Sequence, residues 1–169
     1  TYPPRWTPKQ FREDAATATV TFRDERLDEP VELYSQHFDS FESIFDELIG
    51  QLPDLRAKKL DVKAFAALVA NEDTRRALCY LTAPPISDDD LRTLAEASSF
   101  SAARIASDPA GARRIRDLLF RILDPKRFPW VAEKRSPTRT ERRASVIASA
   151  ALVAARKVET FRRNDAKDR

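Results

Sequence analysis

The sequence predicts an all-α protein, a single multi-helix domain that ends in a long Ala-rich helix. Three observations favour this fold class. Glycine occurs only twice in 169 residues, and the dipeptides Asn-Gly and Asp-Gly, which build tight β-hairpins, are absent. Apolar residues recur every three to four positions, which is the period of a helix. Residues that cap helix N-termini stand before most of these apolar segments.

The first two helices are predicted on either side of a proline. Thr7-Pro8 is a typical helix start, with a threonine cap and a proline in the first turn. This helix is expected to run to about Leu27 and to end at Glu29-Pro30. The next helix is expected to end at Gly50, reinforced by Pro53. It has the clearest helical period in the chain, carried by Tyr34, His37, Phe38, Phe41, Ile44, Phe45 and Leu48.

Four shorter helices are predicted in the middle of the chain. Asp61 caps a helix over 62–70, and another covers 72–81. After Pro84-Pro85, Ser87 and Asp90 cap a third helix, which is expected to reach Ala97. Asp108-Pro109 starts the fourth helix, and Asp124-Pro125 ends it.

The last third of the chain is predicted to be an ordered loop followed by a long helix. Residues 125–137 form the loop, because Phe128, Trp130 and Val131 favour burial. Thr138 and Glu141 then have the spacing of a capping box, which opens a helix over 138–164. Its predicted apolar stripe is Val146, Ile147, Ala150, Ala151, Ala154, Val158 and Phe161.

Charge is divided unevenly along the chain. Residues 1–103 carry 12 Lys and Arg against 19 Asp and Glu, whereas residues 104–169 carry 18 against 8. The net charges are therefore −7 and +10, which indicates a polyanionic partner, nucleic acid first. We predict one domain over 1–169, with an acidic helical body at 1–124 and the basic helix at 138–164. The chain contains no Met, and we expect it to be part of a longer protein.

Composition excludes several classes of function. Two glycines are too few for a Gly-rich phosphate loop or a dinucleotide-binding fingerprint. Cys79 and His37 are the only residues of their kinds, so an internal disulfide and a Cys/His zinc site are excluded. A single cysteine also favours a reducing compartment, the cytoplasm. No run of about 18 apolar residues is present, so no transmembrane helix is expected.

No catalytic or metal-binding residue is predicted in this chain. Pro53-Asp54 and Asp61-Val62-Lys63 spell P-D-x6-D-x-K, the pattern of Mg²⁺-dependent nucleases. That chemistry needs a strand pair, however, and we interpret Asp61 as a helix cap. The run 88–90 is interpreted as charge at a helix N-terminus. His37 is expected at the boundary of the core with a hydrogen-bond partner, and Cys79 in the core.

Basic residues around the long helix are the predicted DNA-binding site. They combine cations, hydroxyl groups and a helix N-terminus, all of which bind phosphate. The alternative interpretation is a solvated basic face. The predicted residues are Lys134, Arg135, Thr138, Arg139, Arg142, Arg143, Arg156, Lys157, Arg162 and Arg163.

One segment resembles a known family. The string Phe128-Pro129-Trp130-Val131-Ala132-Glu133-Lys134-Arg135-Ser136-Pro137-Thr138-x-x-Glu141-Arg142, the Ala-rich helix and Arg162-Arg163-Asn164 are similar to the XamI family of type II restriction endonucleases. The resemblance is clearest over 128–167. The preceding helices fit the family only as a general helical N-terminal part.

The resemblance implies a bacterial-type restriction-modification enzyme, a hydrolase that cuts duplex DNA at a short sequence with Mg²⁺. It implies a catalytic module of PD-(D/E)xK type with a Glu-x-Lys strand, and no such strand is predicted here. We therefore expect this chain to be the helical N-terminal region, inactive alone, with the catalytic module downstream and a homodimer possible. No catalytic residue can be carried over to this sequence.

Two alternatives remain open. The first is a protein-interaction or dimerisation domain without direct DNA contact, favoured by the small-residue stripe Ala144, Ala148, Ala151 and Ala155. The second is a regulatory helix-turn-helix DNA binder built from the short helices at 62–97. It is the weaker of the two, because the charge of those helices is balanced or acidic.

Overall fold

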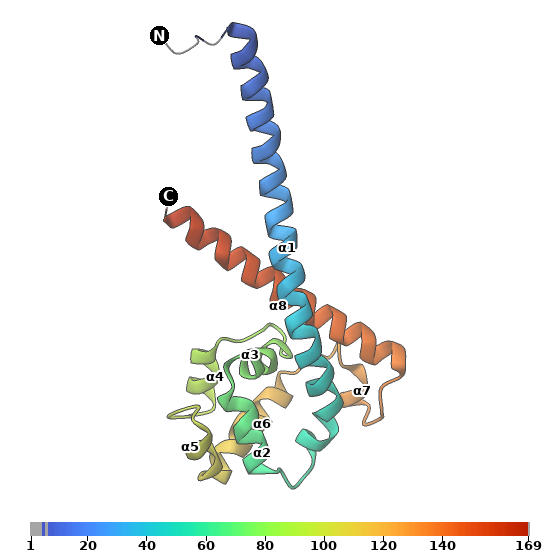
Figure 1. Ribbon diagram of the computed structural model, residues 1–169. Coiled ribbons are helices and arrows are strands. Elements are labelled where there is room, and N and C mark those ends of the chain that lie inside the picture. Colours follow the sequence, from blue (N-terminus) through green and yellow to red (C-terminus); the bar gives the residue numbers. More distant parts are fainter. Residues whose placement is uncertain (1–4, 6, 169) are drawn as a thin grey trace.

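Two long helices cross to form the frame of the molecule (Figure 1). The structure, a computed structural model, describes residue 5 and residues 7–168, and within them it contains eight helices and no sheet. The long helices are α1 (Pro8–Arg56) and α8 (Arg139–Lys167). Between them in the chain come α2 (Val62–Ala70), α3 (Glu72–Tyr80), α4 (Asp88–Leu94), α5 (Ala102–Ala106), α6 (Pro109–Arg121) and α7 (Pro129–Ala132). The predicted all-α fold class is confirmed.

Helix α1 is a single helix of 49 residues, so the predicted break at Glu29-Pro30 is wrong. Proline removes one hydrogen bond and crowds the preceding turn, yet a helix can continue around it when side chains on both sides favour one face. Leu27 and Val31 stand at helical spacing from Tyr34 and Phe38. A continuous helix keeps these residues on one side, but Leu27 and Val31 are 61% and 63% exposed, so burial of this stripe does not explain why α1 continues through Pro30.

Gly50 does not end a helix, contrary to the prediction. Helix α1 continues for six residues beyond it because Leu52 and Leu55 extend the apolar stripe into the core, where they are buried. Gly50 instead allows a close approach. A Cβ atom at this position would lie 2.9 Å from Nη2 of Arg142 on α8, closer than real Cβ contacts allow. Because Nη2 is the tip of a flexible side chain, a larger residue here would require Arg142 to shift rather than the helix backbone.

The core lies where the C-terminal half of α1 meets α8 and the short helices. Phe41 and Phe45 of α1 are buried there, as are Val146 and Val153 of α8. The predicted apolar stripe of α8 is wrong at two positions, since Ile147 and Phe161 are 41% and 46% exposed. Ser145, Ser149 and Val153 are buried in addition to the predicted Val146, Ala150, Ala154 and Val158.

The predicted caps of the remaining helices are confirmed, but several ends differ. Asp61, Ser87 and Asp108 each accept a backbone hydrogen bond at the start of a helix. The Thr138–Glu141 capping box is confirmed, and α8 runs three residues past the predicted end. Helix α4 stops at Leu94, three residues early, and α6 stops at Arg121. The short α5 and α7 were not predicted, the latter lying inside the predicted loop.

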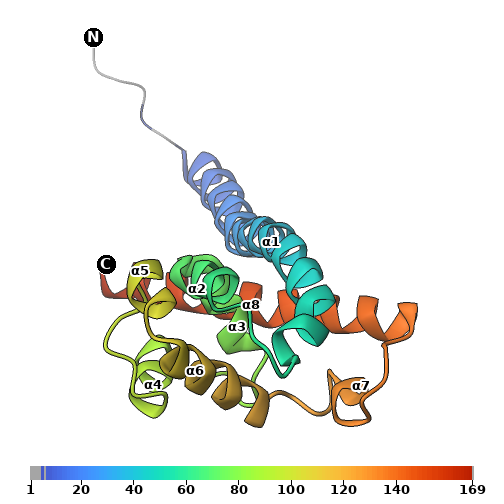
Figure 2. The same ribbon diagram turned by 90° about the horizontal axis from the view of Figure 1, so that it is seen from below.

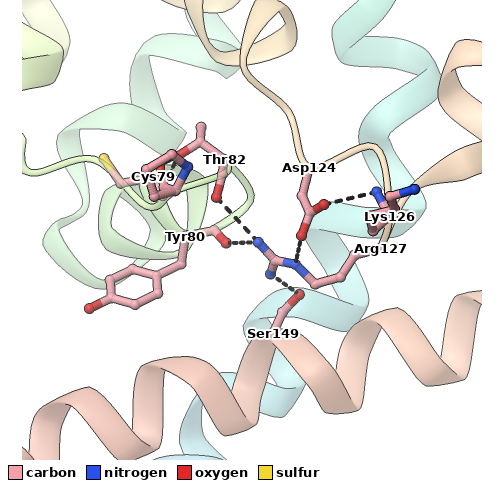
Figure 3. A network of polar contacts seen from close by, with 8 residues as sticks. Cys79, Tyr80, Thr82, Asp124, Lys126, Arg127 and Ser149 are labelled. Carbon is pink, nitrogen blue, oxygen red and sulfur yellow. Dashed lines mark hydrogen bonds and ion pairs between the residues drawn. The ribbon is translucent and has the colours of Figure 1, made fainter.

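Arg127 links three segments beside α8 (Figure 3). Its guanidinium donates to Asp124 at 2.7 Å, to Ser149 of α8 at 2.8 Å and to the carbonyl of Tyr80 at 2.7 Å. It also donates to the carbonyl of Thr82 at 3.3 Å. The arginine and Asp124 are both largely buried, and Arg127 holds the pKa of Asp124 below its usual value despite that burial. The loop before α7 is thereby fixed to α3 and α8.

The N-terminal half of α1 stands clear of the body, as Figures 1 and 2 show. We call residues 8–29 the arm. The described side chains of the arm are exposed, among them Phe11, Phe22 and Leu27 at 50–61%. The C-terminal end of α8 diverges from the arm, and α7 lies by the other end of α8. No helix of the described residues is long and apolar enough to cross a membrane.

Candidate nucleic-acid interface

The N-terminal end of α8 carries six of the ten residues predicted to bind DNA. Lys134 follows α7 with a positive φ of 53°, and its side chain is exposed. Arg139 is exposed in the first turn of α8. No carboxylate of the described residues lies within ion-pair distance of either cation. These two side chains are therefore available to an external anion.

Arg135 is held by carboxylates of its own chain. Its Nη1 and Nη2 atoms donate to the two carboxylate oxygens of Glu141 at 2.7 and 2.8 Å, and Nε donates to Glu133 at 2.5 Å. The hydrogen bonds from Arg135 and from the backbone of Thr138 lower the pKa of Glu141 to about 2. A carboxylate thus already faces the N-terminus of α8, the place where the sequence predicted a phosphate. A phosphate would have to compete with Glu141 there.

Arg142 and Arg143 point towards α1 and tie the two long helices together. Nη2 of Arg142 donates to the carbonyl and the side chain of Asp46 at 3.0 and 3.3 Å. Nη2 of Arg143 lies 3.4 Å from a carboxylate oxygen of Glu42. These contacts give both arginines a structural task in addition to their predicted role in DNA binding.

A pocket of about 550 Å³ opens between the C-terminal end of α1 and the turn from α7 to α8. We call it the α7 pocket. Arg56, Lys134 and Arg135 line it with Ser136, over an apolar floor that includes Trp130. Arg56 also donates to the backbone carbonyl of Val131. Sequence reasoning missed Arg56, although the following Lys58 and Lys59 mark a basic run. The fold therefore adds a distant cation to the predicted group.

The other four predicted residues lie near the C-terminal end of α8. Glu159 accepts from Arg163 at 2.5 Å and more weakly from Arg156 at 3.5 Å, and these contacts lower its pKa. Lys157 packs with its ammonium 5.2 Å from the centre of the Phe41 ring. Arg162 lines the gap between the arm and α8. The ten predicted residues therefore form two groups at opposite ends of the helix.

A second basic pocket, of about 470 Å³, lies where α1, α3 and α8 meet. We call it the three-helix pocket. His37 of α1 and Arg76 and Tyr80 of α3 line it, and sequence reasoning connected none of the three with the basic residues. His37 is half-buried at the core boundary, as predicted, but its ring has no hydrogen-bond partner among the described residues. The residues that α8 contributes are Arg156, Lys157, Thr160, Phe161 and Asn164.

The acidic motifs do not assemble a metal site. Among the residues that the structure describes, no three Asp, Glu, His or Cys side chains lie close enough to hold one ion. Asp54 sits near the end of α1, while Asp61 caps α2 and Lys63 follows in its first turn. Cys79 is buried in the core, as predicted, and burial raises its pKa to about 12. The residues present do not fit Mg²⁺, and we derive no catalytic step through it.

Comparison with known proteins gives the family. A family model described as XamI restriction endonuclease matches residues 58–169, about two thirds of the chain. The chain belongs to the XamI restriction endonuclease family. The match covers α2 to α8, so it extends the resemblance of the segment 128–167 to the short helices before it.

A relative from Xanthomonas campestris pv. amaranthicola carries the similarity into α1. The chain is 36% identical over 166 residues to this protein, which is named Type II restriction enzyme XamI. The match covers 98% of the chain and 60% of the relative. The chain thus spans about three fifths of the length of that XamI enzyme. No solved structure matches the chain.

Proposed function

We propose that this chain is the helical, DNA-contacting and scaffolding region of a type II restriction endonuclease that cleaves duplex DNA at a specific site. Membership of the XamI family supports DNA as the partner. The observation that carries the proposal is the α7 pocket, where the fold places Arg56 of α1 beside Lys134 and Arg135. Arg135 is already paired with Glu133 and Glu141, so the cations that favour an anionic ligand here are Arg56 and the unpaired Lys134, which come from two distant segments.

The residues at this end of α8 are suited to phosphate rather than to bases. Lys134 and Arg139 are exposed cations that can each neutralise one backbone phosphate, and Ser136 adds a hydroxyl group. Arg56 offers a guanidinium fork at the pocket wall. Such contacts position a protein on DNA without reading its sequence. We therefore propose that this region holds the DNA backbone and orients the protein on it.

In this proposal, DNA cleavage is carried out by residues outside this chain. The described residues do not fit Mg²⁺, and the XamI relative is longer than this chain. We propose that the Mg²⁺-dependent cleavage of the complete enzyme uses residues of a catalytic module outside these 169, and that α8 braces this module. The single, buried cysteine fits the cytoplasmic location expected of such an enzyme.

Salt dependence of DNA binding tests the proposal. The chain should bind a fluorescently labelled duplex weakly, with affinity falling steeply as salt rises. Replacing Arg56, Lys134 and Arg139 together by Gln removes three phosphate contacts, which should flatten the slope of log K against log salt by roughly 2.7. Fluorescence anisotropy at several salt concentrations measures this slope.

A matched variant controls for the loss of net charge. Arg104, Arg113 and Arg121 are exposed cations of α5 and α6, and their triple replacement by Gln should change the slope far less. Circular dichroism checks that both variants fold. Equal slopes for the unmodified chain and the first variant would show that these cations are a solvated face and would overturn the proposal.

A protein-interaction or dimerisation role is the second candidate, and one observation favours it. The outward face of α8 is uncharged over Ala144–Ala155, where Ile147 and Leu152 are 41% and 40% exposed. An apolar face of this kind is typical of helices that pack against another helix. Sedimentation velocity decides between the candidates: a dimer that Leu152→Glu dissociates, with no measurable DNA binding, would favour the second.

A further inference from the structure

We propose that the three-helix pocket is a phosphate-binding site. It lies where α1, α3 and α8 converge, at the far end of α8 from the α7 pocket, and its volume of about 470 Å³ holds a phosphate group with several waters. The identification of a DNA backbone as the source of this phosphate rests on the proposed function. The ability of the pocket to bind a phosphate group does not depend on that source.

Positive charge in this pocket is only partly compensated. Two of its cations, Arg76 and Arg156, also line a neighbouring pocket together with the acidic run 88–90 and Glu159. Arg76, Arg156 and Lys157 line it, and no carboxylate is among its lining residues. The Glu72 carboxylate lies 3.8 Å from Arg76, beyond hydrogen-bond distance. Arg156 shares Glu159 with Arg163, and it is the more distant partner, at 3.5 Å against 2.5 Å. Like charges held together in this way repel one another, and a bound anion relieves that repulsion.

Lys157 shows the same imbalance. No carboxylate of the described residues pairs with it, and its ammonium lies over the face of the Phe41 ring, 5.2 Å from the ring centre. The side chain is half-buried, so its charge is screened less than that of a fully exposed lysine. It is thus the best-placed cation of the pocket for an incoming phosphate.

The pocket also offers neutral donors that no other group uses. Tyr80, Asn164 and His37 line it, and their side-chain polar groups have no hydrogen-bond partner among the described residues. Figure 3 shows that Tyr80 directs its carbonyl to Arg127 while its ring extends away from that contact. The Arg127 network therefore fixes the backbone that carries this donor.

The charge state of His37 reports on the pocket. Burial and the charges of Lys157 and Arg76 lower its pKa, so the ring is neutral at pH 7 and can donate one N–H group. A phosphate bound beside these cations would add negative charge and favour the protonated ring. Occupancy of the pocket therefore predicts a rise in the pKa of His37.

Nuclear magnetic resonance tests this directly, because His37 is the only histidine and its ring gives a single set of signals. We would follow the ring signal against pH in the 169-residue chain with inorganic phosphate, with a short DNA duplex, and with sodium chloride at matched ionic strength. Saturating phosphate or duplex should raise the pKa of His37 by about 1 unit more than chloride does. The shift should be lost in Lys157→Gln and kept in Arg113→Gln, an exposed control of equal charge change.

The arms of the experiment separate the possible sources and failures. A shift with phosphate but not with duplex assigns the pocket to free phosphate compounds instead of a DNA backbone. A shift with phosphate in a chain that binds no duplex keeps the site and overturns the proposed function. If neither ligand moves the signal beyond chloride, the site is overturned, whether or not duplex binds elsewhere. The titration of the unmodified chain needs no variant, so a misfolded variant cannot mask the result.

Discussion

The fold determines whether an arginine of this chain stabilises the structure or is available to an external ligand. Arg116 is buried and donates to the carbonyls of Leu55 and Ala57 at 3.1 and 2.9 Å, which completes the C-terminal end of α1. Arg127 joins α3, α8 and the loop before α7. Charge counts place both residues in the basic half of the chain, yet neither faces an external partner. A cation becomes a candidate ligand contact only when its own chain leaves it unpaired.

Replacing Arg127 by Leu should lower the free energy of unfolding by about 3 kcal/mol. The substitution leaves the largely buried Asp124 carboxylate with only backbone N–H groups as donors, among them that of Lys126, and it removes the Arg127 donor from the carbonyl of Tyr80. Urea unfolding followed by circular dichroism measures the change. Arg113→Leu on the exposed face of α6 should stay within about 0.5 kcal/mol. Equal effects of the two changes would contradict the structural role of Arg127.

The ion pair of Glu141 makes stability depend on pH in a defined direction. The pKa of Glu141 lies at about 2 in the folded chain, below its ordinary 4.5. The ion pair therefore contributes fully to the free energy of unfolding at pH values above the ordinary pKa of Glu141. This contribution disappears as the pH falls through the pKa of the folded chain. Glu141→Gln keeps a capping-box residue but removes the charge that Arg135 contacts. The stability difference between the two chains should be largest near pH 7 and shrink below pH ~4.5.

Urea unfolding at pH about 7, about 4.5 and about 3 checks this. Ser101→Ala removes a cap without a titrating group, so its effect should stay constant over the same range. A constant difference for Glu141→Gln as well would show that the Arg135 contact has no electrostatic consequence.

At the scale of elements, the sequence predicted where helices begin better than where they end. Starts depend on local chemistry, and Asp61, Ser87 and Thr138 cap as expected. Ends depend on what the next turn can pack against. The proline at 30 and the glycine at 50 are local stop signals, yet α1 continues past both. Beyond Gly50 the buried Leu52 and Leu55 account for this, whereas Leu27 and Val31 on either side of Pro30 are exposed. The apolar positions beyond Gly50 are visible in the sequence and could have predicted that the helix continues there.

Two phenylalanines of α1 differ in burial, because one lies in the packed half of the helix and the other in the arm. Phe45 is fully buried, whereas Phe22 is 50% exposed. Phe45→Ala should destabilise the chain by about 3–5 kcal/mol through lost burial and the cavity it leaves. Phe22→Ala, its matched control, should change stability by no more than about 0.5 kcal/mol. Guanidinium unfolding measures both, and a comparable loss for Phe22→Ala would mean that the arm is packed in solution.

At the scale of the whole molecule, the candidate site was predicted only in part. The basic residues of α8 are visible in the sequence because they cluster along one segment. Arg56, Arg76 and His37 could not be found in this way, because they join those residues only through the crossing of α1 and α3 with α8. The family string at 128–142 was informative because it holds the buried Phe128 and Trp130 as well as the exposed cations.

The absence of a fitted metal site has an expected outcome for the whole chain. Incubated with Mg²⁺ and supercoiled plasmid, the 169-residue chain should not produce nicked or linear DNA. Asp54 lies in the last turn of α1, and Asp61 and Lys63 lie at the start of α2, so they do not form a metal site. Gel electrophoresis of the plasmid measures this, with Asp61→Ala as the matched variant. Reproducible Mg²⁺-dependent cleavage that Asp61→Ala abolishes would restore the P-D-x6-D-x-K motif as an active site.

The arm of α1 turns a small change of angle into a large displacement. At 1.5 Å per residue, the segment 8–29 extends about 33 Å from Pro30. Proline is where a helix bends most readily, since one backbone hydrogen bond is already missing there. A tilt of about 10° at that residue moves the far end of the arm by about 6 Å, roughly one turn of a helix. A bend at Pro30 would thus move the whole arm relative to the part of α1 that Phe41, Phe45 and Leu48 anchor in the core.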